Sequence, residues 1–177
     1  CRHRKLPTTN SAIRVKVDSR VWETSDLVQG NYFEQLNKTV GDFVVWRRDD
    51  IPSYQLAVVV DDNLKKVTHI MRGFDLLDNV GRQLYLLEIL GQTAPRYLHI
   101  PTLNDANHTK LSKHDEASVV NNQFPERNLQ TVLQLLGQSL PPSSQNSNVQ
   151  ELLEWAIVNW QRNAIPKNSC IPNYIGF

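Results

Sequence analysis

One short stretch decides the fold: VTHIMRG, residues 67–73. Its first five residues combine β-branched and apolar side chains, which is typical of a short, buried strand of a parallel sheet. An Arg-Gly pair then ends the strand. Because ligands of open α/β sheets gather at the carboxyl ends of the strands, Arg72 stands where a binding side chain is expected.

A helix and a second strand follow at the spacing of a crossover. Asp78 is a plausible helix N-cap, a Leu-rich segment comes next, and Gly91 supplies the stop signal that often follows a helix. Residues 97–100, YLHI, predict the next strand, and His99 on it is interpreted as structural. Strand, helix and strand in this order predict a βαβ unit and an α/β fold class.

The region before this unit predicts mostly strands. Residues 12–17 alternate apolar and basic side chains, residues 21–27 and 42–48 mix β-branched and aromatic ones, and turn residues separate the segments. Residues 56–60, LAVVV, are apolar without a break, so periodicity alone assigns them to neither helix nor strand.

The region after this unit contains a distinctive polar segment, KLSK, at residues 110–113. Two lysines three residues apart, with a small hydroxyl residue between them, suit a polyphosphate. Taken alone, the same four residues also fit a solvated surface turn. Pro125 then opens a helix that Gly137 ends, residues 138–149 predict a loop, and residues 151–162 predict a last helix.

Composition limits the class of protein. The 177 residues carry 19 basic and 18 acidic side chains, so any RNA contact must come from local basic patches such as residues 2–5, 47–48 and 65–66. No apolar run approaches the ~20 residues that a membrane helix requires, and no secretory signal opens the chain. These features predict a cytoplasmic protein without a membrane segment, and we expect a monomer.

The order of these segments, ending in LHIP at 98–101 and KLSK at 110–113, resembles the C-terminal half of the catalytic core of class I glutamyl-tRNA synthetases. Within that family, the match is closest to members that attach glutamate to queuosine in tRNA(Asp). The resemblance implies the second half of a Rossmann-type catalytic core at residues 51–122, with residues 54 onward in a helix. Residues 1–50 would be the remainder of a strand-rich, zinc-associated inserted subdomain, and residues 123–177 a C-terminal helical segment.

The resemblance also implies an activity and a set of site residues. The expected reaction is ATP-dependent activation of L-glutamate and transfer of the glutamyl group to queuosine at the wobble position of tRNA(Asp), with Mg²⁺ arriving with ATP. The catalytic and ATP-binding residues would be Lys110, Leu111, Ser112 and Lys113, of which the two lysines are catalytic. The glutamate-binding residues would be Tyr54 and Arg72.

Each of these assignments has a simpler alternative. Arg72 could instead pair with Asp75, and Tyr54 could be a core tyrosine. Cys1 falls where the family places the last ligand of a zinc site, and its other three ligands would precede this chain. Cys1 and Cys170 are too few for a disulfide framework.

The resemblance leaves two alternative functions open. The family's His-Ile-Gly-His-like ATP motif lies roughly a hundred residues upstream and does not occur here, so we expect a fragment that is inactive alone. The short stretch after Lys113 leaves no room for a full anticodon-binding domain, which favours queuosine as the acceptor. The alternatives are a fragment of a standard glutamyl-tRNA synthetase that charges tRNA(Glu), or a non-catalytic, synthetase-derived RNA-binding module.

Overall fold

The computed structural model describes residues 2, 9–104, 110–111, 120–142 and 147–172. The chain divides into two compact units. Unit 1 comprises residues 1–71 and 76–98, and unit 2 comprises residues 72–75 and 99–177. The division falls inside two strands, β5 (His69–Gly73) and β6 (Arg96–Ile100), so each strand begins in unit 1 and ends in unit 2.

The first part of unit 1 is built from two antiparallel strand pairs. The elements are β1 (Ile13–Val15), which pairs with β4 (Phe43–Trp46), and β2 (Trp22–Asp26), which pairs with β3 (Gly30–Glu34). The three strands predicted in this region are confirmed. Strand β3 and the short helix α1 (Leu36–Thr39) were not predicted.

A side chain closes the β2–β3 hairpin. The carboxylate of Asp26 accepts hydrogen bonds from the backbone N–H groups of Val28 and Gln29, both at 2.9 Å, and Gly30 follows with φ of 87°. An aspartate that turns the chain in this way, with a glycine in a left-handed conformation, is a common signal for a turn. Asp26 and Gly30 therefore shape the turn that joins β2 to β3.

Two helices complete unit 1. Helix α2 (Tyr54–Leu64) begins after Ser53, whose Oγ accepts a hydrogen bond from the N–H of Leu56 at 3.4 Å. Residues 56–60, which periodicity alone assigned to neither helix nor strand, are therefore helical. Helix α3 (Val80–Ile89) follows a 3₁₀ helix, η1 (Phe74–Asn79), and Gly91 ends its last turn with φ of 66°.

The predicted N-cap of α3, Asp78, is wrong by one residue. The capping position belongs to Asn79, because the 3₁₀ turn continues to that residue before the α-helix starts.

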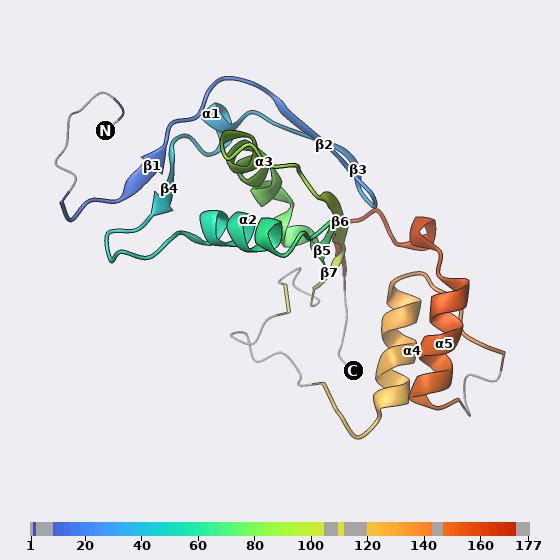
Figure 1. Ribbon diagram of the computed structural model, residues 1–177. Coiled ribbons are helices and arrows are strands. Elements are labelled where there is room, and N and C mark those ends of the chain that lie inside the picture. Colours follow the sequence, from blue (N-terminus) through green and yellow to red (C-terminus); the bar gives the residue numbers. More distant parts are fainter. Residues whose placement is uncertain (1, 3–8, 105–109, 112–119, 143–146, 173–177) are drawn as a thin grey trace. The chain divides into compact units, whose positions relative to one another are not determined.

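Helix α3 lies between α2 and the β2–β3 hairpin (Figure 1). The core of unit 1 joins α2 and α3 to α1, β4 and the segment after β1 through buried side chains, namely Val17, Leu36, Phe43, Val59, Tyr85, Leu86 and Leu87.

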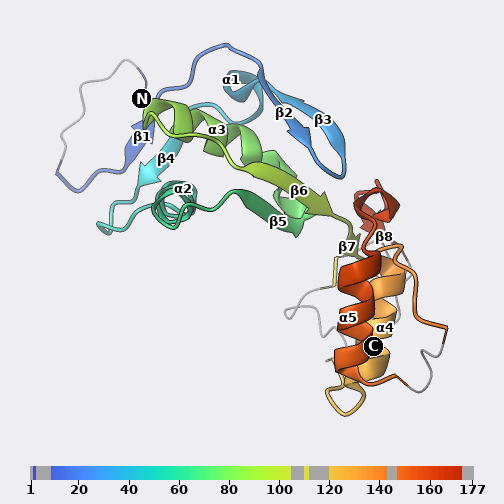
Figure 2. The ribbon, with the colours of Figure 1, turned by 45° about the vertical axis from the view of Figure 1, so that its right-hand side comes forward.

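Strands β5 and β6 form a pair, and their arrows run in the same direction in Figure 2. The predicted βαβ unit is thereby confirmed as β5, α3 and β6. The expected burial of the first strand is wrong, since Met71 is 61% exposed. The reason is that β6 is the one strand paired with β5 within the described part of the chain, so the described residues do not enclose β5.

Unit 2 combines a small parallel strand pair with a helical hairpin. Strand β7 (Thr102–Leu103) pairs in parallel with β8 (Cys170–Ile171). Helices α4 (Pro125–Leu135) and α5 (Val149–Asn159) lie side by side in both views (Figures 1 and 2), and a 3₁₀ turn, η4 (Arg162–Ala164), follows them. Both predicted helices are confirmed. No helix among the described residues combines the length and apolar character needed to cross a bilayer.

Candidate active site

Arg72 lies at the carboxyl end of β5, next to the end of β6. Its Nε donates a hydrogen bond to Nε2 of His99, at 2.9 Å, and His99 is completely buried. Because the Nε of arginine always carries its proton, Nε2 of His99 acts as the acceptor and the proton of a neutral imidazole lies on Nδ1. The buried imidazole therefore fixes the plane of the guanidinium.

The turn after Arg72 is shaped by a glycine. A Cβ added to Gly73 would lie 2.4 Å from Oδ1 of Asp75 and 3.5 Å from Cγ2 of Thr102. The carboxylate of Asp75 is therefore folded back over the backbone of Gly73, an approach that requires a residue without a side chain.

Lys110, the first lysine of the KLSK segment, contacts this same turn. Its Nζ lies 2.6 Å from Oδ2 of Asp75, and both side chains are partly exposed. The backbone of the segment is also attached, because the N–H of Leu111 donates to the carbonyl of Leu103 at 2.9 Å. Lys110 and Asn104 form an isolated antiparallel bridge.

Unit 2 thus brings together two of the predicted site residues, Arg72 and Lys110, through the turn at residues 72–75. Tyr54 belongs to unit 1, on the first turn of α2, and is 56% exposed, so it is not a core tyrosine. Cys1, Ser112 and Lys113 lie outside the described residues. The chemical roles assigned to all these residues stay predictions.

Two contributors to the site were not assigned a role from the sequence. His99 was interpreted as structural, and Asp75 was considered only as a partner of Arg72; the structure shows His99 bonded to Arg72 and Asp75 bonded to Lys110. The available signal was position, because His99 stands near the end of its strand, as Arg72 does. Polar residues at the ends of neighbouring parallel strands meet at one edge of a sheet.

A buried polar network supports the start of α2 in unit 1. Gln55 donates to Oδ1 of Asn79, and Gln83 donates to Oε1 of Gln55 at 3.1 Å. Arg82 also donates to Oδ1 of Asn79, at 2.7 Å. Since Gln55 follows Tyr54 directly, these bonds fix the end of α2 that carries Tyr54.

Tyr32, on the β2–β3 hairpin of unit 1, has a strongly shifted pKa. Burial, reinforced by the negative charges of Glu34 and Asp78, raises the pKa of Tyr32 to about 12. Arg82 opposes this shift. The phenol therefore stays neutral well beyond physiological pH.

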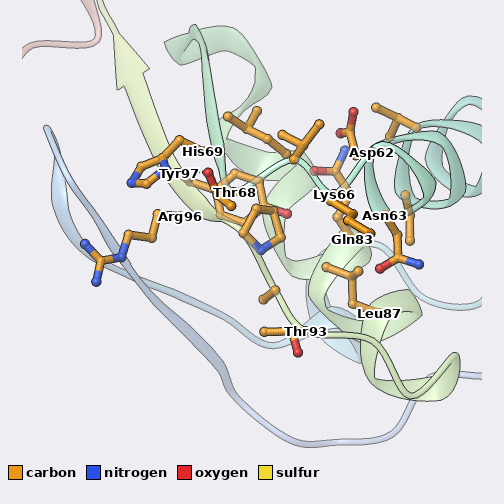
Figure 3. Close-up of a pocket in the computed structure, with 16 residues that line it drawn as sticks. Asp62, Asn63, Lys66, Thr68, His69, Gln83, Leu87, Thr93, Arg96 and Tyr97 are labelled. Carbon is orange, nitrogen blue, oxygen red and sulfur yellow. Dashed lines mark hydrogen bonds between the residues drawn. The ribbon is translucent and has the colours of Figure 1, made fainter.

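A cavity of about 650 Å³ in unit 1 lies at the other end of the strands (Figure 3). Its lining comes from the end of α2, from α3 and from the segments that lead into β5 and β6, and includes Asn63, Lys66, Thr68, Leu87 and Arg96. None of Tyr54, Arg72 and Lys110 lines it. Because open α/β sheets bind ligands at the carboxyl ends of their strands, this cavity is not the candidate site.

The described residues contain no group of three or more His, Cys, Asp or Glu side chains placed to hold a metal ion. The zinc prediction rests on Cys1, which the structure does not describe.

The fold and these residues define a class of protein. Residues 2–165 match the family model described as tRNA synthetases class I (E and Q), catalytic domain. The chain belongs to this family, and the predicted class I synthetase relationship is confirmed.

Individual proteins of known name are also similar to this chain. The chain is 42% identical over 160 residues to a protein of Methylococcus capsulatus named glutamyl-Q tRNA(Asp) synthetase. The aligned region covers 90% of this chain and 53% of that protein. A protein of Pseudomonas fluorescens with the same name is 38% identical over 172 residues, covering 97% of the chain and 58% of the relative. The chain therefore spans little more than half the length of these relatives.

Solved structures confirm the fold. A crystal structure of a glutamate tRNA ligase from Elizabethkingia meningosepticum, in complex with its amino acid, superimposes with a TM-score of 0.68 at 22% identity. The match covers 93% of this chain and 36% of the ligase. A glutamate-tRNA synthetase from Elizabethkingia anophelis gives a TM-score of 0.67 at 21% identity, covering 90% of this chain and 36% of the other. The α/β class and the class I catalytic core are as predicted.

Proposed function

We propose that the protein containing this chain activates L-glutamate with ATP and transfers the glutamyl group to queuosine in tRNA(Asp). One observation carries the proposal: the turn at residues 72–75 holds both a guanidinium suited to a carboxylate and a lysine of the KLSK segment. The two relatives named glutamyl-Q tRNA(Asp) synthetase support the choice of acceptor.

Glutamate activation requires positioning and charge stabilisation more than covalent help from the protein. The α-carboxylate must lie in line with the α-phosphate of ATP, and the departing pyrophosphate must be neutralised. The guanidinium of Arg72, oriented by His99, can hold a substrate carboxylate through two parallel hydrogen bonds.

The remaining predicted residues complete this assignment. Tyr54 offers its hydroxyl to glutamate as a single directional hydrogen bond. Lys113, with Lys110, Leu111 and Ser112, is assigned to the triphosphate, and Mg²⁺ enters with ATP. For the whole protein we also propose a zinc site with Cys1 as one ligand and domain boundaries after residues 50 and 122. We further propose that the protein is monomeric and cytoplasmic.

A standard glutamyl-tRNA synthetase that charges tRNA(Glu) is the second candidate. The Elizabethkingia structures favour it by name, but at 21–22% identity they support the fold alone. The relatives at 38–42% identity carry the queuosine-related name, which favours the first candidate. A non-catalytic RNA-binding module would be expected to have lost Arg72 or the KLSK segment, and the chain retains both.

The test uses the full-length protein and labelled L-glutamate. We expect glutamate-dependent exchange of pyrophosphate into ATP, and transfer of label to tRNA(Asp) that contains queuosine. Matched tRNA(Asp) that lacks queuosine should remain unlabelled, and Lys113→Ala should abolish exchange. Labelling of tRNA(Glu) at its 3′ end, with both forms of tRNA(Asp) inert, would reject the proposal in favour of a standard synthetase. Transfer without any dependence on ATP would reject both.

A further inference from the structure

We propose that Asp75 is a positioning residue that tethers Lys110, the first lysine of the KLSK segment, to the turn following Arg72. This inference rests on the proposed glutamate-activating function and adds a residue to it. Asp75 would act through Lys110 and would not contact the substrates itself.

The contact itself is short and specific. Nζ of Lys110 lies 2.6 Å from Oδ2 of Asp75, and the other oxygen, Oδ1, rests over Gly73. One carboxylate oxygen therefore faces the ammonium while the other is packed against the backbone that immediately follows Arg72. The orientation of the carboxylate is fixed by the glycine as much as by the lysine.

Lys110 is held at a second point through its backbone. The Leu111 N–H bonds to the Leu103 carbonyl, and Lys110 bridges to Asn104. Leu103 lies on β7, which pairs with β8. With the backbone attached to β7 and the ammonium attached to Asp75, the first residue of the KLSK segment has both its position and its direction fixed.

The pair also has an electrostatic consequence for the neighbouring arginine. Asp75 stands three residues after Arg72, so its uncompensated negative charge would oppose binding of an anionic amino acid or nucleotide there. The ammonium of Lys110 offsets that charge.

Partly exposed ion pairs contribute little to stability, so this pair is not needed to hold the fold together. The side chains of Lys110 and Asp75 are 51% and 37% exposed. A loss of activity without a loss of stability is therefore the signature that separates positioning from a structural role.

The test compares four variants of the full-length protein: Asp75→Asn, Lys110→Gln, the two combined, and Lys110→Arg. Gly73→Ala is a fifth variant, because its new Cβ would displace the Asp75 carboxylate while leaving both charges in the sequence. The matched control is Glu88→Gln, which breaks an exposed pair with Arg20 at 2.7 Å. Pyrophosphate exchange gives kcat and the KM values for ATP and glutamate, and thermal unfolding gives the stability.

We expect Asp75→Asn and Lys110→Gln each to lower kcat by roughly tenfold to a hundredfold, since small misplacements of catalytic groups have effects of this size. The melting temperature should fall by no more than roughly 4 °C. The double variant should be no worse than the more severe single one, because both break the same contact. Gly73→Ala should resemble Asp75→Asn, and Glu88→Gln should match the unmodified protein. Lys110→Arg keeps a cation beside Asp75, so it should lose less activity than Lys110→Gln.

Two outcomes would overturn the inference while the proposed function stands. Asp75→Asn could leave the kinetics unchanged, or Lys110→Gln could be far more damaging than Asp75→Asn with the two effects multiplying in the double variant. The second result would mean that Lys110 acts on the nucleotide without Asp75. Absence of glutamate-dependent exchange in the unmodified protein would instead reject the proposed function, and the tether with it.

Discussion

Replacing His99 by leucine should lower kcat/KM for glutamate, because the buried His99 accepts a hydrogen bond from Arg72. The hydrogen bond from Nε of Arg72 to Nε2 of His99 is 2.9 Å long, and His99 is 0% exposed. Leucine has a similar size and no acceptor, so the guanidinium would lose the partner that fixes its plane.

The magnitude follows from the charge on the donor. Hydrogen bonds to charged groups contribute about 1.5–3 kcal/mol, and each ~1.4 kcal/mol corresponds to a factor of ten. If the full loss appears in the transition state, kcat/KM for glutamate should fall by roughly tenfold to a hundredfold. His99→Gln places an oxygen acceptor near the former position of Nε2, so it should recover a large part of this loss.

The assay is glutamate-dependent pyrophosphate exchange in the full-length protein, with the concentration of glutamate varied at saturating ATP. The control for general destabilisation is Gly137→Ala, which strains the helical hairpin and should leave the KM for glutamate unchanged. An unchanged kcat/KM in His99→Leu would refute the reasoning. So would a His99→Gln variant as impaired as the leucine variant, because the acceptor would then be irrelevant.

Three further predictions concern stability. Gly137→Ala should cost about 2–5 kcal/mol, because φ of 70° is unfavourable for alanine and the new Cβ would lie 2.1 Å from the Ala164 carbonyl oxygen; Gly91→Ala, with φ of 66° and open space around it, should cost only about 1–2 kcal/mol. Equal losses in urea unfolding would contradict this contrast. Gly81→Ala should cost about 1–3 kcal/mol in the same assay, since its Cβ would meet a buried carboxylate oxygen at 2.2 Å. Because burial raises the pKa of Tyr32 to about 12, whereas an unfolded tyrosine ionises near pH ~10, stability should fall as the pH rises from about 10 to about 12; this loss should be absent in Tyr32→Phe.

The elements with strong local signals were predictable. The Gly91 stop and the βαβ order of β5, α3 and β6 were read from the sequence and confirmed. The resemblance indicated the helical state of α2, and the Ser53 cap supports it. Strand β3 was missed because its formation depends on the Asp26 turn and on pairing with β2, not on a pattern of its own. The 3₁₀ helix η1 was also missed. As a result, the predicted start of α3 was wrong by one residue.

The candidate site was predictable in its members and not in its contacts. Arg72 and Lys110 were chosen from strand ends and from the KLSK segment, and the structure places both against the turn at residues 72–75. The partner of each was not predicted, because the sequence is equally compatible with an ion pair between Arg72 and Asp75. Tyr54 belongs to the other unit, and its role stays a prediction.

The sequence by itself determined the family, the βαβ order of β5, α3 and β6, the helices α4 and α5, and the residue types available for chemistry, since local patterns carry them. Only the tertiary structure decided that His99 orients Arg72 and that Asp75 holds Lys110. These contacts join residues 27 and 35 positions apart. Such pairings depend on how neighbouring strands align and on the missing side chain of Gly73, and no local pattern records either of them.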